Sequence, residues 1–151
     1  MNDPVVVSVN VSEQKGTRKH PLQGPVAITM LGMEGDAHAG DWHRQLSLLA
    51  QESIDKMQGH GLALQPGDFA ENVTTQGLDL LSLPVGTRLQ IGTSLTMEVT
   101  QIGKECHLGC EIRKLVGDCV MPREGIFTRV ITPGTIQAGD IITIISKGGT
   151  L

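Results

Sequence analysis

The sequence predicts a mainly β, barrel-like fold with a few short inserted helices, built as a single domain over residues 1–151. Short apolar runs rich in β-branched residues recur at roughly 8–12-residue spacing and are separated by turn signals. Nineteen glycines and seven prolines stand against an aromatic content of only 2%, which indicates a turn-rich chain with an aliphatic core. A chain of 151 residues fits one compact domain and leaves little room for two.

The first half of the chain alternates strand patterns with polar loops. Alternating valines in residues 1–10 predict an opening strand, and the apolar run 25–31 predicts a second strand that ends at Gly32. Residues 45–49 predict a short strand. Residues 50–60 are the best helix candidate, because apolar residues recur at helical spacing and an acidic residue precedes a basic one.

The second half is dominated by strand patterns. Residues 88–91 and 95–102 flank a glycine-bearing turn and predict a β-hairpin. Residues 126–131 and the β-branched run 141–145 predict the last two strands. Weaker patterns predict an irregular or strand segment at 69–75, an apolar segment at 78–83, one or two helical turns at 110–116 and a turn at 133–134.

Charge and hydropathy exclude several classes of protein. Twelve basic and sixteen acidic residues give a net charge of −4, which argues against a general nucleic-acid binder. No apolar run approaches the ~18–20 residues of a membrane span, and the first residues lack the basic and apolar regions of a signal peptide. Three cysteines are an odd count, as expected for reduced thiols in the cytoplasm. We therefore expect a cytoplasmic protein with neither nucleic-acid nor membrane partners.

The first chemical constellation is the glycine-flanked loop at residues 35–45. It gathers two carboxylates, two imidazoles and a guanidinium, from Asp36, Asp41, His38, His43 and Arg44. A loop can converge such groups on one ligand, and the planar arginine fork suits phosphate or carboxylate. The alternative is a solvated loop whose aspartates cap turns.

The second constellation surrounds Cys106, which follows the predicted strand 95–102. Lys104 and His107 flank this cysteine, and neighbouring cations favour the reactive thiolate. A free cysteine is more often a small buried hydrophobe, but the polar neighbours argue against that interpretation here. Cys110 is expected to pack on a short amphipathic turn and Cys119 to be structural.

Zinc binding is an alternative use of the same residues. Cys106, His107, Cys110 and Cys119, with His38 or His43, could supply four ligands. Structural zinc sites, however, usually show two paired knuckles, and this sequence has one C-x₃-C at most. A chain of this length also has enough core to fold without a metal.

Basic residues form the third constellation. In the predicted strand 126–131, Phe127 and Arg129 share one face, so Arg129 needs an anionic partner, either Glu98 or Glu124 or a ligand. Lys15, Arg18 and Lys19 are either a solvated loop or a phosphate clamp. Neither the P-loop nor the dinucleotide-binding fingerprint occurs in the sequence.

Several longer motifs occur along the chain: GDAHAG at 35–40, HRQLSLL at 43–49, PGDFAENVTTQG at 66–77, LPVG at 83–86, TQIGKECH at 100–107 and VMPREGIF at 120–127. Together they resemble the MOSC domain family, named for the C-terminal part of molybdenum cofactor sulfurase, in its stand-alone bacterial form. The resemblance covers roughly residues 5–145.

This resemblance implies a β-rich, barrel-like domain that binds molybdenum cofactor (molybdopterin), with Cys106 carrying sulfur or ligating the metal. A thiolate is a soft ligand suited to such a centre. The implied contacts to the cofactor's anionic groups are Lys15, Lys19, Arg44, Arg123 and Arg129. The implied hydrogen-bonding and proton-handling groups are Asp36, His38, His43, Glu71, Asn72 and His107.

The resemblance leaves three functions open. The leading expectation is sulfur transfer to the metal through a Cys106 thiolate or persulfide. The alternatives are reduction of N-hydroxylated compounds and non-catalytic carriage of the cofactor. The chain shows no sulfurase-type domain and no pyridoxal-phosphate site, so a separate sulfur-donor or electron-donor protein is expected. A cofactor-receiving molybdoenzyme and a homodimer are further possible partners. Many family members carry glycine where this chain has Ala70, which puts the local backbone in question.

Overall fold

The computed structural model describes residues 3–14, 18–57, 64–103 and 124–148, and it is built mainly of β-strands. The two helical elements are short: α1 (Gln51–Met57) and the 3₁₀ helix η2 (Leu80–Ser82). The strands are β1 (Val5–Val11), β2 (His20–Pro21), β3 (Val26–Thr29), β4 (Gly32–Met33), β5 (Leu46–Ala50), β6 (Val73–Gln76), β7 (Arg88–Ile91), β8 (Leu95–Ile102), β9 (Ile126–Thr132), β10 (Gly134–Ile136) and β11 (Ile142–Ser146).

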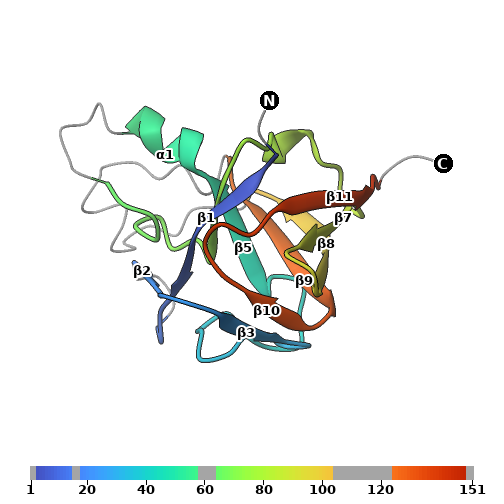
Figure 1. Ribbon diagram of the computed structural model, residues 1–151, viewed down its shortest axis with the longest axis horizontal. Coiled ribbons are helices and arrows are strands. Elements are labelled where there is room, and N and C mark those ends of the chain that lie inside the picture. Colours follow the sequence, from blue (N-terminus) through green and yellow to red (C-terminus); the bar gives the residue numbers. More distant parts are fainter. Residues whose placement is uncertain (1–2, 15–17, 58–63, 104–123, 149–151) are drawn as a thin grey trace.

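Eight of these strands form one strongly curled sheet in the order β11-β7-β8-β9-β5-β6-β1-β2 (Figure 1). The curl brings the start of β11 back to β1, where Val5 and Ile141 form an isolated bridge. Val6 N–H donates to the Asp140 carbonyl at 2.8 Å beside this bridge. The expected mainly β fold with few helices is therefore confirmed, but the sheet is not a closed barrel, because a single bridge rather than a continuous ladder joins β1 to β11.

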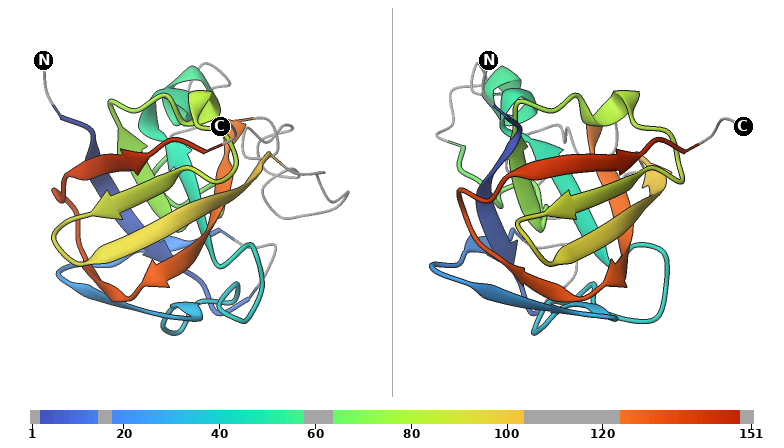
Figure 2. Two further views of the ribbon diagram at one scale, coloured as in Figure 1. Left: turned by 90° about the vertical axis from the view of Figure 1, so that its right-hand side faces the viewer. Right: turned by 45° about the vertical axis from the view of Figure 1, so that its right-hand side comes forward.

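The second sheet, in the order β10-β3-β4, lies across one end of the curled sheet, at the bottom of Figure 2. Helix α1 and η2 lie at the opposite end. Because α1 has only seven residues, its stability must come from packing rather than from helix propensity. It packs against β5 and β6.

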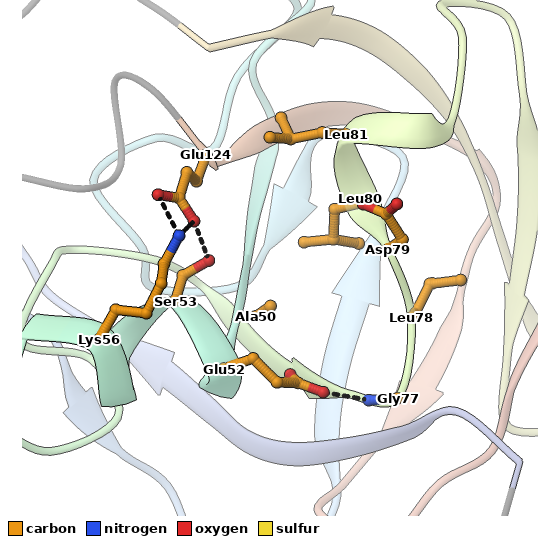
Figure 3. Close-up of a pocket in the computed structure, with 10 residues that line it drawn as sticks. All are labelled: Ala50, Glu52, Ser53, Lys56, Gly77, Leu78, Asp79, Leu80, Leu81 and Glu124. Carbon is orange, nitrogen blue, oxygen red and sulfur yellow. Dashed lines mark hydrogen bonds and ion pairs between the residues drawn. The ribbon is translucent and has the colours of Figure 1, made fainter.

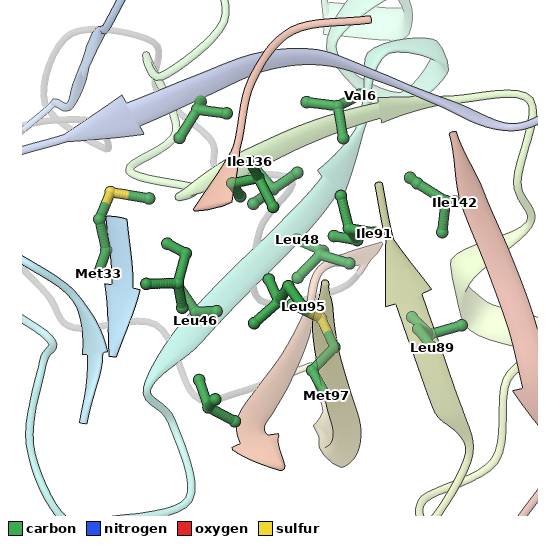
Figure 4. Packing of buried hydrophobic residues seen from close by; sticks show 14 of the residues in the cluster. Val6, Met33, Leu46, Leu48, Leu89, Ile91, Leu95, Met97, Ile136 and Ile142 are labelled. Atoms are coloured by element: carbon green, nitrogen blue, oxygen red, sulfur yellow. The ribbon is translucent and has the colours of Figure 1, made fainter. Parts of the chain in front are cut away.

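The interior of the curled sheet is aliphatic, as the composition predicts. Leu46, Leu48, Leu89, Leu95 and Met97 are all 0% exposed and point toward one another from three strands, β5, β7 and β8 (Figure 4). Each such side chain contributes about 1.5–3 kcal/mol when it is fully buried. This core fixes the strands whose ends and loops carry the polar groups discussed below.

Most predicted elements are confirmed, with local differences. The hairpin of β7 and β8 has the predicted boundaries. The strand expected at 25–31 ends at Thr29, because Met30 and Leu31 form the turn into β4. Strand β10 begins at Gly134, where the sequence predicted only a turn. The predicted helical turns at 110–116 lie outside the described residues.

Candidate functional site

A buried lysine lies at the centre of a polar cluster formed by Ser12, Lys19, Asp36 and His38, which we call the ammonium cluster. Lys19 Nζ donates to Asp36 Oδ1 at 2.8 Å and to Ser12 Oγ at 3.0 Å. The side chains of Lys19 and Asp36 are both 0% exposed. A buried charge is tolerated only when it is paired and hydrogen-bonded, and here both conditions are met.

Local hydrogen bonds bring Asp36 to this position. It follows Gly35, whose φ of +83° is in the left-handed region that glycine favours. Its carboxylate also accepts hydrogen bonds from the backbone N–H of Ser12 at 3.1 Å and of His38 at 2.9 Å. Burial by itself raises the pKa of Asp36, but the neighbouring His38 ring and backbone N–H, the Lys19 hydrogen bond and the Lys19 charge outweigh it. The pKa of Asp36 therefore lies well below its ordinary value of 3.8.

His38 is oriented by the same lysine. Its Nδ1 atom lies 3.2 Å from Lys19 Nζ and 3.6 Å from Asp36 Oδ2. An ammonium group has donors only, so Nδ1 of the neutral ring accepts this hydrogen bond and the ring proton is on Nε2. The His38 side chain is 17% exposed, which makes it the member of the pair that solvent or a ligand can reach.

Beside the cluster, Trp42 and Arg44 of the loop stack with Phe127 of β9, and we call these three side chains the stacked platform. The His38 and Trp42 rings are nearly parallel, with centroids 6.4 Å apart. The Arg44 guanidinium carbon lies 5.5 Å from the ring centroids of both Trp42 and Phe127. Arg44 Nε is buried and has no hydrogen-bond partner in the described part of the chain. Stacking therefore holds the guanidinium while one of its donors remains unused.

Hydrogen bonds attach the C-terminal part of the loop of residues 35–45 to strand β8. His43 Nε2 lies 3.0 Å from Gln101 Oε1, and Thr100 Oγ1 donates to the His43 carbonyl. Gln101 Nε2 in turn donates to the Gly103 carbonyl at 2.7 Å. The loop of residues 35–45 therefore meets the C-terminal end of β8, which lies four positions before Cys106 in the sequence.

Glu71 and Asn72 are buried in the protein interior. They are 0% and 1% exposed, and their described hydrogen bonds all run to protein atoms. Glu71 Oε2 accepts hydrogen bonds from Gly67 N–H at 2.9 Å and from Thr74 Oγ1 at 2.7 Å. Burial raises the pKa of Glu71 above 4.5, against the opposing effect of these hydrogen bonds. A direct contact of either residue with a cofactor stays a prediction.

Arg129 has a protein partner. Its Nη2 atom lies 3.2 Å from Glu98 Oε2, and the Arg129 side chain is 46% exposed. Of the two acidic partners that the sequence offered, the structure selects Glu98, which also pairs with Arg88. An additional contact of Arg129 with a ligand stays a prediction.

Four of the predicted site residues, Lys15, Cys106, His107 and Arg123, lie outside the described residues. So do Cys110 and Cys119, which the zinc alternative requires. Within residues 3–14, 18–57, 64–103 and 124–148, no group of three or more histidine, cysteine, aspartate and glutamate side chains is placed to hold a metal ion. No helix among these residues is long and apolar enough to cross a membrane.

Two surface hollows lie near the predicted residues without uniting them. One, of about 340 Å³, lies between α1 and η2, where Glu124 contacts Lys56 and Ser53 (Figure 3). Another, of about 350 Å³, lies beside β2 and is lined in part by Arg18 and Asp68. Lys19 contributes only main chain to that second hollow, because its side chain is fully buried.

Sequence reasoning missed four residues that build the site. Gly67 and Gln101 lie within the motifs at 66–77 and 100–107 but were assigned no role, and Ser12 is an ordinary polar residue that nothing in the sequence distinguishes. Trp42 had a signal, because the chain's single tryptophan lies between the two histidines of one motif. The structure brings Lys19, Asp36 and His38 together, and through Trp42 it joins them to Arg44 and His43.

The curled sheet and its polar loop define a small β-rich domain with its functional groups at strand ends. Within that class, a model of the MOSC domain matches residues 35–143 of the chain. The chain therefore belongs to the MOSC domain family. A search of curated protein sequences finds no match to it.

Solved structures show the same fold at low sequence identity. The YuaD protein from Bacillus subtilis superimposes with a TM-score of 0.75 at 19% identity, covering 92% of this chain and 94% of that one. YiiM from Geobacillus stearothermophilus gives 0.73 at 22% identity, covering 95% and 75% of the two chains. YiiM from Escherichia coli gives 0.73 at 20% identity, covering 100% and 73%.

The family is associated with molybdenum cofactor, whose pterin carries a phosphate group. Donors in the loop of residues 35–45 fit a phosphate. Arg44 Nε, which has no hydrogen-bond partner within the described ranges, is a donor suited to an anionic oxygen. Lys19 is a poorer candidate for direct contact, because its three hydrogen-bond partners equal the number of its ammonium donors.

Proposed function

We propose that this protein binds a molybdopterin-type cofactor and that Cys106 transfers sulfur to the bound metal. The observation that carries the proposal is the stacked platform, where two rings hold the Arg44 guanidinium and its Nε has no hydrogen-bond partner among the described residues. It stands on the loop that His43 and Gln101 fasten to the end of β8, just before the cysteine in the sequence. The family match to residues 35–143 supplies the cofactor class.

Four residues contact the cofactor in this proposal: Arg44, Lys15, Arg123 and His38. Arg44 binds the cofactor phosphate, with Lys15 and Arg123 as further anion contacts. His38 presents its Nε2 proton as a hydrogen-bond donor, because Lys19 occupies its Nδ1. When bound, the cofactor supplies a metal that a soft thiolate can ligate.

The sulfur reaches Cys106 from a separate donor protein that carries a persulfide. The Cys106 thiolate attacks the outer sulfur of that persulfide, the donor's S–S bond breaks, and the donor leaves as a thiolate. Cys106 is then a persulfide, with no net change in oxidation of the pair. Delivery of its outer sulfur to the metal at the sulfide level would take two electrons from an electron-donor protein and would return Cys106 to the thiolate. A reducing cytoplasm preserves the thiolate that this exchange requires.

Intact-mass spectrometry tests this step. The protein is incubated anaerobically with a low-molecular-weight persulfide and then digested to locate any added sulfur. We expect one extra sulfur atom on Cys106 in the wild type and in the Cys110→Ser control, and none in Cys106→Ser. Sulfur on Cys110 or Cys119 instead, or no adduct at all, would contradict the proposal. Elemental analysis for molybdenum, tungsten and zinc on anaerobically purified protein tests cofactor binding separately.

A second function, reduction of N-hydroxylated compounds, is favoured by the ammonium cluster. Cleavage of an N–O bond to amine and water consumes two electrons and two protons. The hydrogen-bonded pair of Lys19 and His38 is a group that can pass a proton toward the surface. An electron-donor protein supplies the electrons in this version.

An activity assay distinguishes sulfur transfer and reduction of N-hydroxylated compounds from non-catalytic carriage of the cofactor. The cofactor-loaded protein is assayed with an aliphatic hydroxylamine and dithionite as the reductant. Amine formation that His38→Gln reduces tenfold or more supports the reductase. Tight cofactor binding with neither turnover nor a Cys106 persulfide would support the carrier and contradict both enzymatic proposals.

A further inference from the structure

A line of hydrogen bonds, joined by the covalent bonds of Gly67 and Lys19, connects Glu71 to the ammonium cluster through the turn of residues 66–70. Glu71 Oε2 accepts the Gly67 N–H at 2.9 Å. The Gly67 carbonyl accepts the Lys19 N–H at 2.8 Å. Lys19 Nζ then reaches His38 Nδ1 at 3.2 Å. One residue, Gly67, therefore connects a fully buried carboxyl group to the backbone of the lysine that orients His38.

Gly67 packs closely against the main chain of Lys19. Its φ is +92°, and a Cβ built on it would lie 2.3 Å from the Lys19 carbonyl oxygen and 3.3 Å from Asn10 Cβ. No side chain fits in that space. The turn thus lies directly on the Lys19 main chain, so a shift of the turn must shift Lys19 as well.

Glu71 is fixed firmly enough to define the position of the turn. It is 0% exposed, and Thr74 Oγ1 also donates to its Oε2 at 2.7 Å. Its own carbonyl accepts a hydrogen bond from Asn10 Nδ2 at 3.1 Å. Strands β1 and β6 therefore hold Glu71 from two sides, while Oε2 alone makes both described carboxyl contacts.

We propose that Glu71 is a positioning residue, which sets Lys19 through Gly67 and thereby keeps His38 in the form protonated on Nε2. This deepens the proposed function, on which its relevance rests, by assigning Glu71 a place behind the site instead of in contact with the cofactor. Only an acceptor at the Oε2 position is required, so glutamine can replace glutamate at 71.

The test measures the His38 tautomer in the cofactor-free protein, by two-bond ¹H–¹⁵N correlation in ¹⁵N-histidine-labelled samples. We expect the wild type and Glu71→Gln to show His38 protonated on Nε2. Lys19→Met removes the donor to His38 Nδ1 and should give a mixture of tautomers. Glu71→Ala should give a mixture as well. Ile54→Ala, which opens a cavity in α1 away from the site, controls for general destabilisation and should leave His38 unchanged.

Several results would overturn the proposal. An unchanged tautomer in folded Glu71→Ala would leave Glu71 only a structural role, and an unchanged tautomer in Lys19→Met would remove Lys19 from the line. Should Glu71→Ala fail to fold, amide hydrogen exchange of the wild type decides. The Gly67 and Lys19 amides should open together, with protection factors within about threefold, whereas independent opening contradicts the coupling. Because no cofactor is present, these outcomes do not depend on whether the proposed function holds.

Discussion

The Nζ atom of Lys19 lies 2.8 Å from Oδ1 of Asp36, and neither side chain has any exposed surface. Lys19 precedes β2 and Asp36 follows β4, so this pair joins the edge of the large sheet to the loop that carries the histidines. Removing two charges from water has a high desolvation cost, which only mutual attraction and further hydrogen bonds offset. The contacts of Ser12 to both residues supply those further bonds.

Lys19→Met should therefore destabilise the protein by about 3–5 kcal/mol, because it leaves the Asp36 charge buried without its partner. Asp36→Asn in the same chain removes that charge and should recover more than half of the loss. Urea unfolding followed by circular dichroism measures both. A single variant that loses less than about 1 kcal/mol, or a double variant no better than the single one, would contradict the assignment of a buried ion pair.

Asp36 should also make stability fall in acid. Its pKa in the folded protein lies below the ordinary 3.8 of the unfolded chain, so its contribution is complete above that value and is lost as the pH falls through and below it. The urea midpoint of the wild type should decrease from about pH 5 to about pH 3. Asp36→Asn should flatten this decrease, and an equal slope in both proteins would count against it.

Glu71 should act in the opposite direction. Burial raises its pKa above 4.5, so its contribution to stability is complete below 4.5 and is lost as the pH rises through the raised value. Glu71→Gln cannot ionise, and its stability should change less than that of the wild type on going from about pH 5 to about pH 8. The difference between the two proteins in urea midpoint over this range is the measurement. Parallel profiles would show that Glu71 does not titrate there.

The sequence predicted the strands well because each strand carries its own apolar pattern and ends at a turn signal. It also predicted that Asp36, His38 and Arg44 share one functional loop, since they lie in one motif. The partnership of Lys19 with Asp36 was not predictable, because it depends on the pairing of β1 with β2 and on the approach of a distant loop. The role of Gly67 was equally hidden, since its carbonyl meets Lys19 only in the folded chain.

Ala70 shows how a family departure is accommodated. Where the family resemblance led us to expect glycine, this residue has a φ of +67°, and it is the non-glycine residue with positive φ in the described chain. The backbone thus keeps the left-handed turn that glycine favours, at a cost to alanine of about 1–2 kcal/mol. Ala70→Gly should stabilise the protein by about 0.5–1 kcal/mol, since the greater freedom of glycine in the unfolded chain offsets part of the gain. Thermal unfolding measures this, and a loss of stability would contradict it.

The neighbouring threonines of β6 provide a matched pair of tests. Thr75 is 0% exposed, and its Oγ1 has no hydrogen-bond partner among the described residues. Thr75→Val should therefore be neutral or stabilising by up to about 1 kcal/mol, because it removes an unsatisfied hydroxyl and keeps the shape. Thr74 Oγ1 instead donates to Glu71 and accepts from Asn10, so Thr74→Val should cost about 1–3 kcal/mol. Urea unfolding of the two variants under the same conditions gives the comparison. Equal losses would show that Thr75 has a partner as well.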